Sequence, residues 1–305
     1  MPELNLSTQW VACALCDRND AKPVCINDAL QIVKCAHCGM VFVNPQPTEN
    51  ALQNYYSAQN LMQQESWSSY FEHQPKQIAD LWSRRFRDIR RLTNGRNVRL
   101  LDVGSGYGDF LHTARQAGWQ VHGFEFSEPV AEISRKKYGI SVAVGEIFDL
   151  PAARNSFDVI TIWHVLEHLR NPLAVLKRCR ELLVPGGILV IEVPNLHFLA
   201  RKSYRFPLSM TLHLYHFSAR TLPPLVERAS FKVLECRPGH TGYLYRSKAK
   251  IYAMKCIYGI SHVADTLLGL NVSDSIRLYA SKKPSEVRAS TGTLSEGELR
   301  CIQSN

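Results

Sequence analysis

The chain has 305 residues, 45% of them apolar, and a formal net charge of +9. This length and composition suit one large globular domain with small attachments. No uninterrupted apolar run reaches the roughly 18 residues of a membrane-spanning helix, and the first residues lack a basic and then apolar leader, so we expect a cytoplasmic protein that does not span a membrane.

Four of the nine cysteines form two C-x-x-C pairs, Cys13 with Cys16 and Cys35 with Cys38. Each pair places two thiolates on one side of a tight turn, and the spacing between the pairs is that of a four-cysteine zinc ribbon. The metal would replace a core that so short a segment cannot build. We therefore predict a zinc ribbon over residues 1–45 with these four ligands. A redox dithiol or chance pairing is the alternative.

A connector follows at residues 46–97, which we expect to be helical. Its aromatic residues either close over a bound cofactor as a lid or form a core between domains. From residue 98 the chain alternates apolar runs with amphipathic segments. Strands are predicted near residues 98–103, 120–125, 141–144, 157–163 and 187–193, with two more within 230–236 and 275–283, and helices near 109–117, 129–138 and 172–183.

This alternation predicts an α/β domain over residues 98–283, with a mainly parallel Rossmann-like sheet, helices on both faces and ligands beyond the carboxyl ends of the strands. Residues 237–271 are too long for a hairpin connection and read as a helical insertion, which serves as a substrate lid, a packing helix or a segment on a membrane surface. The polar tail at residues 284–305 is expected to be disordered.

Basic residues are concentrated late in the chain. Residues 201–256 contain eleven Lys and Arg but two Glu, so the whole net charge falls within this segment. Such a surface indicates an anionic substrate, nucleic acid or lipid headgroups nearby, with an ordinary solvated surface as the alternative.

The first strand ends in the sequence VRLLDVGSGYGDF, with Asp102 before three glycines, Gly104, Gly106 and Gly108. A dinucleotide fingerprint has a different glycine spacing. The pattern D-x-G-x-G-x-G, followed by Glu125 at the end of the second strand, resembles the class I S-adenosylmethionine-dependent methyltransferases. The resemblance implies a seven-stranded methyltransferase sheet. It also implies that the glycines admit the methionine and ribose, that Asp102 orients the amino acid end, and that Glu125 binds the ribose hydroxyls.

Further segments resemble the same family in order. The sequence VGEIFDLP is similar to the segment that contacts adenine, which implies a role for Glu146, and Ile147 is expected to pack on the ring. Phe126, after the second strand, and His164, after the fourth, complete the predicted cofactor site. The family resemblance covers residues 98–194 most closely.

The four-cysteine ribbon together with the late sequence LHLYHFS resembles methyltransferases of sugar and polysaccharide biosynthesis, including nucleotide-deoxysugar C-methyltransferases. The resemblance implies that His213 is the catalytic base, with His216 as a second candidate. Leu212 stands where that family has Glu. The two histidines would share a face if this segment were helical. The acceptor implied is a small anionic molecule, either a nucleotide sugar or a glycan precursor, methylated on oxygen or carbon.

The sequence HVLEH carries His164, Glu167 and His168, which would converge on a helical turn. A similar segment holds a divalent metal in some quinone-biosynthesis methyltransferases, and helix capping or cofactor positioning is the other role open to these residues. Two further functions stay open. The ribbon and the basic segment are compatible with RNA methylation, although nucleobase-modifying motifs are absent, and a non-catalytic adaptor would use the ribbon to bind a partner. The oligomeric state is not predicted.

Overall fold

The computed structural model describes residues 7–27, 30–54, 75–198, 213–239 and 272–283, and within the insertion residues 256–257, 259–261, 263–265, 267 and 270. Seven strands form the central sheet in the order β12-β13-β10-β9-β6-β7-β8. Strands β8, β7, β6, β9 and β10 are parallel to one another, and β13 is antiparallel to both β10 and β12. The predicted Rossmann-like methyltransferase sheet is confirmed. The strands are β6 (Arg99–Val103), β7 (Gln120–Glu125), β8 (Val142–Val144), β9 (Phe157–Trp163), β10 (Leu183–Pro194), β12 (Phe231–Gly239) and β13 (Ser275–Lys282).

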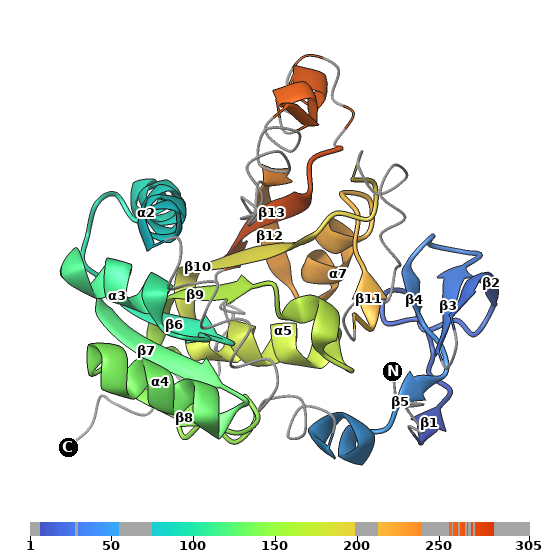
Figure 1. Ribbon diagram of the computed structural model, residues 1–305, viewed down its shortest axis with the longest axis horizontal. Coiled ribbons are helices and arrows are strands. Elements are labelled where there is room, and N and C mark those ends of the chain that lie inside the picture. The colour runs from blue at the N-terminus through green and yellow to red at the C-terminus, as the bar shows by residue number, and fades with distance from the viewer. Residues whose placement is uncertain are drawn as a thin grey trace, which may run out of the picture.

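Helices cover both faces of this sheet (Figure 1). They are α2 (Pro75–Leu92), α3 (Asp109–Gln116), α4 (Glu128–Tyr138), α5 (Pro172–Leu182) and α7 (Leu222–Arg228), with a short 3-10 turn, η1, at Leu166–His168. Side chains of α2, α3 and α4 pack in one core and those of α5 and α7 in the other. Successive residues of β10 alternate between the two cores, as the period of a strand buried on both faces requires: Val190 belongs to the first core and Ile191 to the second.

The N-terminal segment forms small sheets that are completed by a strand from far along the chain. Strands β2 (Ala21–Asn27), β3 (Leu30–Cys35) and β4 (Val41–Val43) are joined by β11 (Tyr215–His216), and β1 (Thr8–Gln9) pairs with β5 (Gln46–Pro47). The Phe42 and Tyr215 rings stack with centroids 6.1 Å apart. Because residues of this sheet share a core with α5 and α7, the N-terminal segment packs directly on the methyltransferase domain.

The insertion leaves and re-enters the sheet at its carboxyl edge. Gly239 at the end of β12 and Pro194 at the end of β10 both pair with Ser275, the first residue of β13. The predicted start of the insertion at residue 237 is wrong, because residues 237–239 pair with β13 and belong to β12. Residues assigned as helix lie within 256–267. The predicted disordered tail and much of the predicted connector fall outside the described residues.

Candidate functional site

The glycine loop joins β6 to α3 and has left-handed backbone conformations, with φ of 72° at Gly104, 52° at Gly106 and 80° at Gly108. A Cβ on Gly104 would lie 2.3 Å from a methyl group of Val165, so only glycine allows this approach. A Cβ on Gly106 would meet no atom within 4 Å. The loop therefore packs against the protein at Gly104 and faces open space at Gly106, where a cofactor can approach the backbone.

Glu125 organises this loop from the end of β7. Its carboxylate accepts hydrogen bonds from the backbone N–H groups of Gly106, Phe126 and Ser127, at 2.9, 3.0 and 3.2 Å. Burial raises the pKa of Glu125, and the three N–H donors act in the opposite direction. The Phe126 side chain is 41% exposed beside it. The carboxylate predicted to bind the ribose thus has a second task, because it fixes the loop.

Asp102 lies within β6, between β7 and β9, and its residue is 2% exposed. The hydroxyl of Thr161 donates a hydrogen bond to its carboxylate over 2.6 Å. Burial raises the pKa of Asp102 well above its ordinary value. Asp102 is therefore held rigidly beneath the glycine loop, where its predicted partner is the amino acid end of the cofactor.

The predicted adenine segment follows β8. A hydrogen bond with Glu49, followed by burial, raises the pKa of Glu146 to about 7. Ile147 is 5% exposed and packs in the core, whereas Phe148 is 50% exposed. The expectation that Ile147 covers the adenine ring is not supported, because its side chain is used in the core. Phe148, which was not predicted as a site residue, offers an exposed apolar surface instead. Its exposure could not be read from the sequence, because it lies in a short run that mixes apolar and acidic residues.

His164 lies between two buried carboxylates after β9. Its Nδ1 is 3.6 Å from Glu167 and its Nε2 is 3.4 Å from Glu192, whose residues are 1% and 0% exposed. Burial opposes the charge on the ring, but the two carboxylates raise the pKa of His164 to about 9. The backbone at His164 has a φ of 55°, and its N–H donates to the carbonyl of Glu192. His164 is thus a half-buried imidazole that its backbone hydrogen bond and two flanking carboxylates hold at the end of the sheet.

Glu192 anchors a network of charges that the sequence analysis missed. Its carboxylate accepts hydrogen bonds from Arg85 of α2, from Arg277 at 2.6 Å and from the Ser275 hydroxyl at 3.2 Å. Arg277 also pairs with Asp88 of α2 at 3.0 Å. These contacts tie the connector helix to β10 and β13, directly behind His164. The predicted lid segment therefore includes a helix that is fixed to the sheet.

Glu167, His168 and His213 form a cluster in which one donor atom from each lies within 4.8 Å of the others. Neither side-chain oxygen of Glu167 accepts a hydrogen bond from the described residues, since His164 at 3.6 Å is too distant for one. Burial opposes ionisation of Glu167, but His164, His168 and His213 together lower its pKa. The two histidines of HVLEH therefore differ in their surroundings. His168 belongs to the cluster with Glu167 and His213, whereas His164 lies between Glu167 and Glu192.

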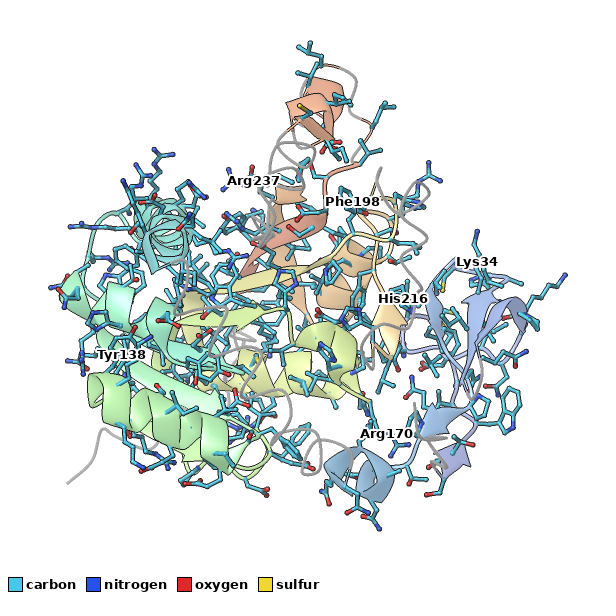
Figure 2. The ribbon with its side chains drawn as sticks, in the orientation of Figure 1. Lys34, Tyr138, Arg170, Phe198, His216 and Arg237 are labelled. Atoms are coloured by element: carbon cyan, nitrogen blue, oxygen red, sulfur yellow. The ribbon has the colours of Figure 1, made fainter. Side chains whose placement is uncertain are left out.

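His213 and His216 do not share a helix face. His216 belongs to the strand β11, whose edge pairs with β4, because the ladder with Val41 and Phe42 competes successfully with helix formation. The two rings lie 6.3 Å apart between centroids, and the His213 ring is 4.6 Å from that of His168. Figure 2 shows His216, which is 4% exposed, where the N-terminal sheet meets the main domain.

The four cysteines of the C-x-x-C pairs converge, with all four sulfur atoms within 4.8 Å of one another. The sulfurs of Cys13 and Cys38 are 3.5 Å apart, as are those of Cys16 and Cys35. Burial raises the pKa of the Cys38 thiol to about 11. Four sulfur atoms gathered in a partly buried site suit a thiophilic cation, which would favour their thiolate forms.

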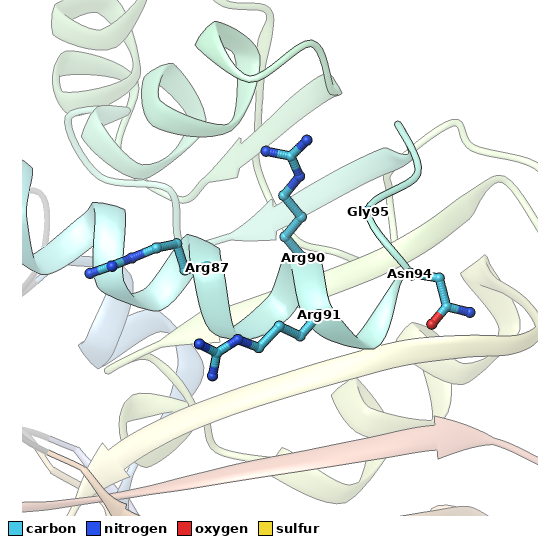
Figure 3. A pocket seen from close by; sticks show the side chains of 5 residues that line it. All are labelled: Arg87, Arg90, Arg91, Asn94 and Gly95. Carbon is cyan, nitrogen blue, oxygen red and sulfur yellow. The ribbon is translucent and has the colours of Figure 1, made fainter.

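A shallow basic pocket lies away from this site. It is lined by Arg87, Arg90, Arg91, Asn94 and Gly95 at the end of α2 (Figure 3). These residues lead into the beginning of β6, at the amino edge of the parallel strands, whereas the glycine loop follows the end of β6. The pocket is therefore separate from the candidate active site. None of the described helices combines the length and apolar character needed to cross a membrane.

Known proteins with similar sequences are methyltransferases. The ubiquinone biosynthesis O-methyltransferase of Cereibacter sphaeroides is 35% identical over 114 residues, which cover 36% of this chain and 46% of that protein. The enzyme of the same name from Xanthomonas campestris is 32% identical over 104 residues, covering 32% and 44%. The alignments with these curated relatives thus span less than half of their length.

One solved structure with the same fold is a chain from the Haloferax volcanii complex between the Trm112 methyltransferase activator and a methyltransferase. It is 16% identical, the match covers 72% of this chain and 96% of that one, and the TM-score is 0.53. A family model described as a methyltransferase domain matches residues 70–236, more than half of the chain. The chain therefore belongs to the methyltransferase-domain family, and its domain is a class I S-adenosylmethionine-dependent methyltransferase.

Proposed function

We propose that this protein transfers a methyl group from S-adenosylmethionine to a hydroxyl oxygen of a small molecule. The observation that carries the proposal is the cluster of Glu167, His168 and His213 at the carboxyl edge of the sheet, where the glycine loop also lies. A hydroxyl acceptor needs a group that removes its proton, and this cluster provides imidazole nitrogens beside a buried carboxylate.

In this proposal His213 accepts the proton of the acceptor hydroxyl as the oxygen attacks the methyl carbon. The carbon–sulfur bond breaks, and the electron pair remains on sulfur in the demethylated cofactor. Glu167 supplies the carboxylate partner that the sequence lacks at Leu212, because folding brings it close to His213. His164 is not the base, since both of its ring nitrogens face carboxylates and its pKa is raised to about 9.

A divalent cation is a second role for the same cluster. One carboxylate and two imidazoles are a donor set that suits zinc, iron or manganese. The buried Glu167 oxygens, which lack hydrogen-bond donors among the described residues, favour this role. When bound, the cation would lower the pKa of a hydroxyl that coordinates to it.

Three classes of acceptor are supported by different observations. The relatives are named for O-methylation in ubiquinone biosynthesis, which favours an aromatic hydroxyl. The ribbon and the LHLYHFS segment support the alternative, a nucleotide sugar or glycan precursor. RNA is a third acceptor, suggested by the ribbon and the basic segment. We place the aromatic hydroxyl first, because the sequence identity to those relatives exceeds 30% over about a third of the chain.

We also propose that Cys13, Cys16, Cys35 and Cys38 hold a structural zinc ion. All four sulfurs are engaged in the cluster, so no coordination position is left for a substrate. This ion would stabilise the sheet that β11 completes and would take no part in the reaction.

The test is transfer of a labelled methyl group to catechols and other phenols, nucleotide sugars, glycan precursors and RNA. On the acceptor that is methylated, His213→Ala and Glu167→Gln should lower turnover by about 10²–10⁴-fold with cofactor affinity unchanged. His122→Ala, on β7 and outside the cluster, is the matched control. Metal content separates the two roles of the cluster: a second bound ion that disappears in Glu167→Gln supports the cation. Full activity of both cluster variants would refute the proposed role.

A further inference from the structure

Exposed arginines cover one side of α2 and the turn that follows it. The opposite side of this helix is buried and includes Ile78, Phe86 and Ile89. The exposed set, which we call the arginine face, consists of Arg84, Arg87, Arg90, Arg91 and Arg96. Within the helix each of these follows another by three or four residues, so their side chains are neighbours on its surface.

The carboxylates of the protein do not pair with this face. Of the two acids in α2, Asp80 makes no ion pair among the described residues, and Asp88 pairs with Arg237 and Arg277 at 2.7 and 3.0 Å. No other carboxylate of the described residues forms a salt bridge with the arginine face, and Arg96 donates only to a backbone carbonyl. The positive charge of this face is therefore not compensated within the described part of the chain.

The arrangement works against the stability of the helix itself. Arg87 and Arg91 are four residues apart, and like charges at this spacing repel each other and destabilise a helix. The helix dipole favours Arg90 and Arg91, which lie in the last turn, but gives no such benefit to Arg84 and Arg87. A partner that brings several negative charges would remove this repulsion.

The extent of the arginine face favours a long partner over a single anion. Arg84 and Arg91 are seven residues apart, which is about 10 Å along the helix axis. Figure 3 shows the side chains of Arg87, Arg90 and Arg91 extending in different directions around the shallow hollow. The last turn of a helix presents carbonyl groups, so it offers no backbone N–H groups to an isolated anion. A chain of regularly spaced negative charges can contact these arginines together.

The composition of the face favours phosphate groups. Arginine donates two parallel hydrogen bonds to phosphate oxygens, and its charge persists at every physiological pH. The other exposed residues of α2 include Lys76, Gln77 and Ser83. Leu92 is the one large apolar side chain exposed among residues 75–99, so this surface lacks the apolar face that enters a bilayer.

We propose that the arginine face binds the sugar–phosphate backbone of a nucleic acid. Contacts with phosphates carry no sequence information, so binding is independent of sequence and is weakened by salt. The last turn of α2 leads into the start of β6, whereas the glycine loop follows the end of β6, so the hollow of this face is separate from the cofactor loop. The proposal goes beyond the methyl-transfer function and does not depend on which acceptor is used.

The test is fluorescence anisotropy of a labelled single-stranded RNA, and of the DNA of the same sequence, titrated with the full-length protein without cofactor or acceptor. We expect binding whose dissociation constant rises with salt. Arg87→Gln with Arg91→Gln should raise that constant roughly tenfold at about 0.1 M salt and reduce the slope of its logarithm against that of salt by about 1.4, or about 0.7 for each phosphate contact. Arg87→Lys with Arg91→Lys keeps the charge and should keep the slope.

The matched control removes the same two charges elsewhere. Lys177 of α5 and Lys232 of β12 are exposed, and α5 packs on the other face of the sheet from α2. Lys177→Gln with Lys232→Gln should bind as the unmodified protein does. Circular dichroism and the melting temperature of each variant verify that folding is retained.

Three results would overturn the proposal. They are absence of binding to both nucleic acids at low salt, equal losses in the two glutamine double variants, and displacement of the label by polyglutamate as effectively as by unlabelled RNA. The second would show that only the net charge matters, and the third would make the face a surface for acidic proteins. Binding of either nucleic acid that the arginine variants alone weaken supports the proposal. Because no methyl transfer is measured, its failure is distinguishable from failure of the proposed function.

Discussion

The backbone N–H of Leu214 donates a hydrogen bond to the carbonyl of Glu167 over 2.8 Å. The carbonyl of Leu214 in turn accepts one from the N–H of Val43 in β4, also at 2.8 Å. Three segments that are distant in the sequence therefore meet in one hydrogen-bonded chain: the N-terminal sheet, the residue after His213, and the loop that follows β9. The position of His213 beside Glu167 depends on the N-terminal sheet, so the proposed zinc ribbon supports the active site.

We expect the purified protein to contain about one zinc ion in the ribbon, because four converging thiolates are a complete tetrahedral ligand set. Replacing Cys35 and Cys38 by Ser should remove it and lower the melting temperature, whereas Cys256→Ser should leave both unchanged. Metal analysis of protein purified without chelator, combined with thermal unfolding, measures this. Zinc that persists in the double variant would assign it to another site.

Alanine at Gly104 and at Gly106 should have different effects. Gly104→Ala brings a Cβ to 2.3 Å from Val165 at a φ of 72°, so the loop must move and the free energy of unfolding should fall by more than the roughly 1–2 kcal/mol that a left-handed alanine costs. A Cβ on Gly106 meets no atom, so Gly106→Ala should lower the free energy of unfolding only by that conformational penalty. The added methyl group should instead weaken binding of the cofactor. Denaturant unfolding and calorimetric titration with S-adenosylmethionine check both. Equal losses of stability in the two variants, together with equal affinities for S-adenosylmethionine, would contradict the assignment of Gly104 to packing and of Gly106 to the approach of the cofactor.

Glu125→Ala should weaken binding of S-adenosylmethionine by about 1.5–3 kcal/mol for each hydrogen bond lost to the charged acceptor. The reason is that it removes the expected ribose contacts and also releases the N–H groups of Gly106, Phe126 and Ser127. Glu128→Ala, three residues later and paired with Arg135 at the surface, is the control. Titration calorimetry on both variants decides whether Glu125 belongs to the site, and an unchanged affinity removes it.

Arg85→Met should lower the free energy of unfolding by about 3–5 kcal/mol, because it removes one of two arginines from the buried carboxylate of Glu192. Arg85 also lies over the rings of Trp82 and Trp163, with distances to the ring centroids of 4.6 and 4.8 Å. Arg84→Met, at an exposed neighbouring position, should change stability by no more than about 0.5 kcal/mol. Urea unfolding of both proteins tests the difference, and similar values would mean that Arg277 and His164 compensate Glu192 without Arg85.

The free energy of unfolding should fall as the pH rises from about 4.5 to about 7, because Glu146 loses its proton over different pH ranges in the unfolded and folded states. Its hydrogen bond with Glu49 raises the pKa of Glu146 in the folded protein, so the folded state holds a proton in this range that the unfolded chain releases. The Glu146→Gln variant stays neutral and should show a flatter dependence. Melting temperatures across this range measure the effect, and an identical slope in the variant would show that the two carboxyls are not coupled.

The sequence by itself determined the features that depend on local patterns. The alternation of apolar runs specified the order and type of the sheet elements, the glycine spacing marked the loop after β6, and the C-x-x-C pairs marked the cysteine cluster. Each of these signals is carried by neighbours along the chain, where the period of a strand or the steric demand of a turn acts directly.

Tertiary structure alone decided which distant residues meet. Glu167 takes the place beside His213 that the sequence leaves to Leu212, Glu192 gathers Arg85 and Arg277, and His216 enters a strand that pairs with the N-terminal sheet. No local pattern encodes these contacts, because burial of a charge is tolerated only where folding brings its counter-charge from another element, and a short strand forms only where a partner edge is available.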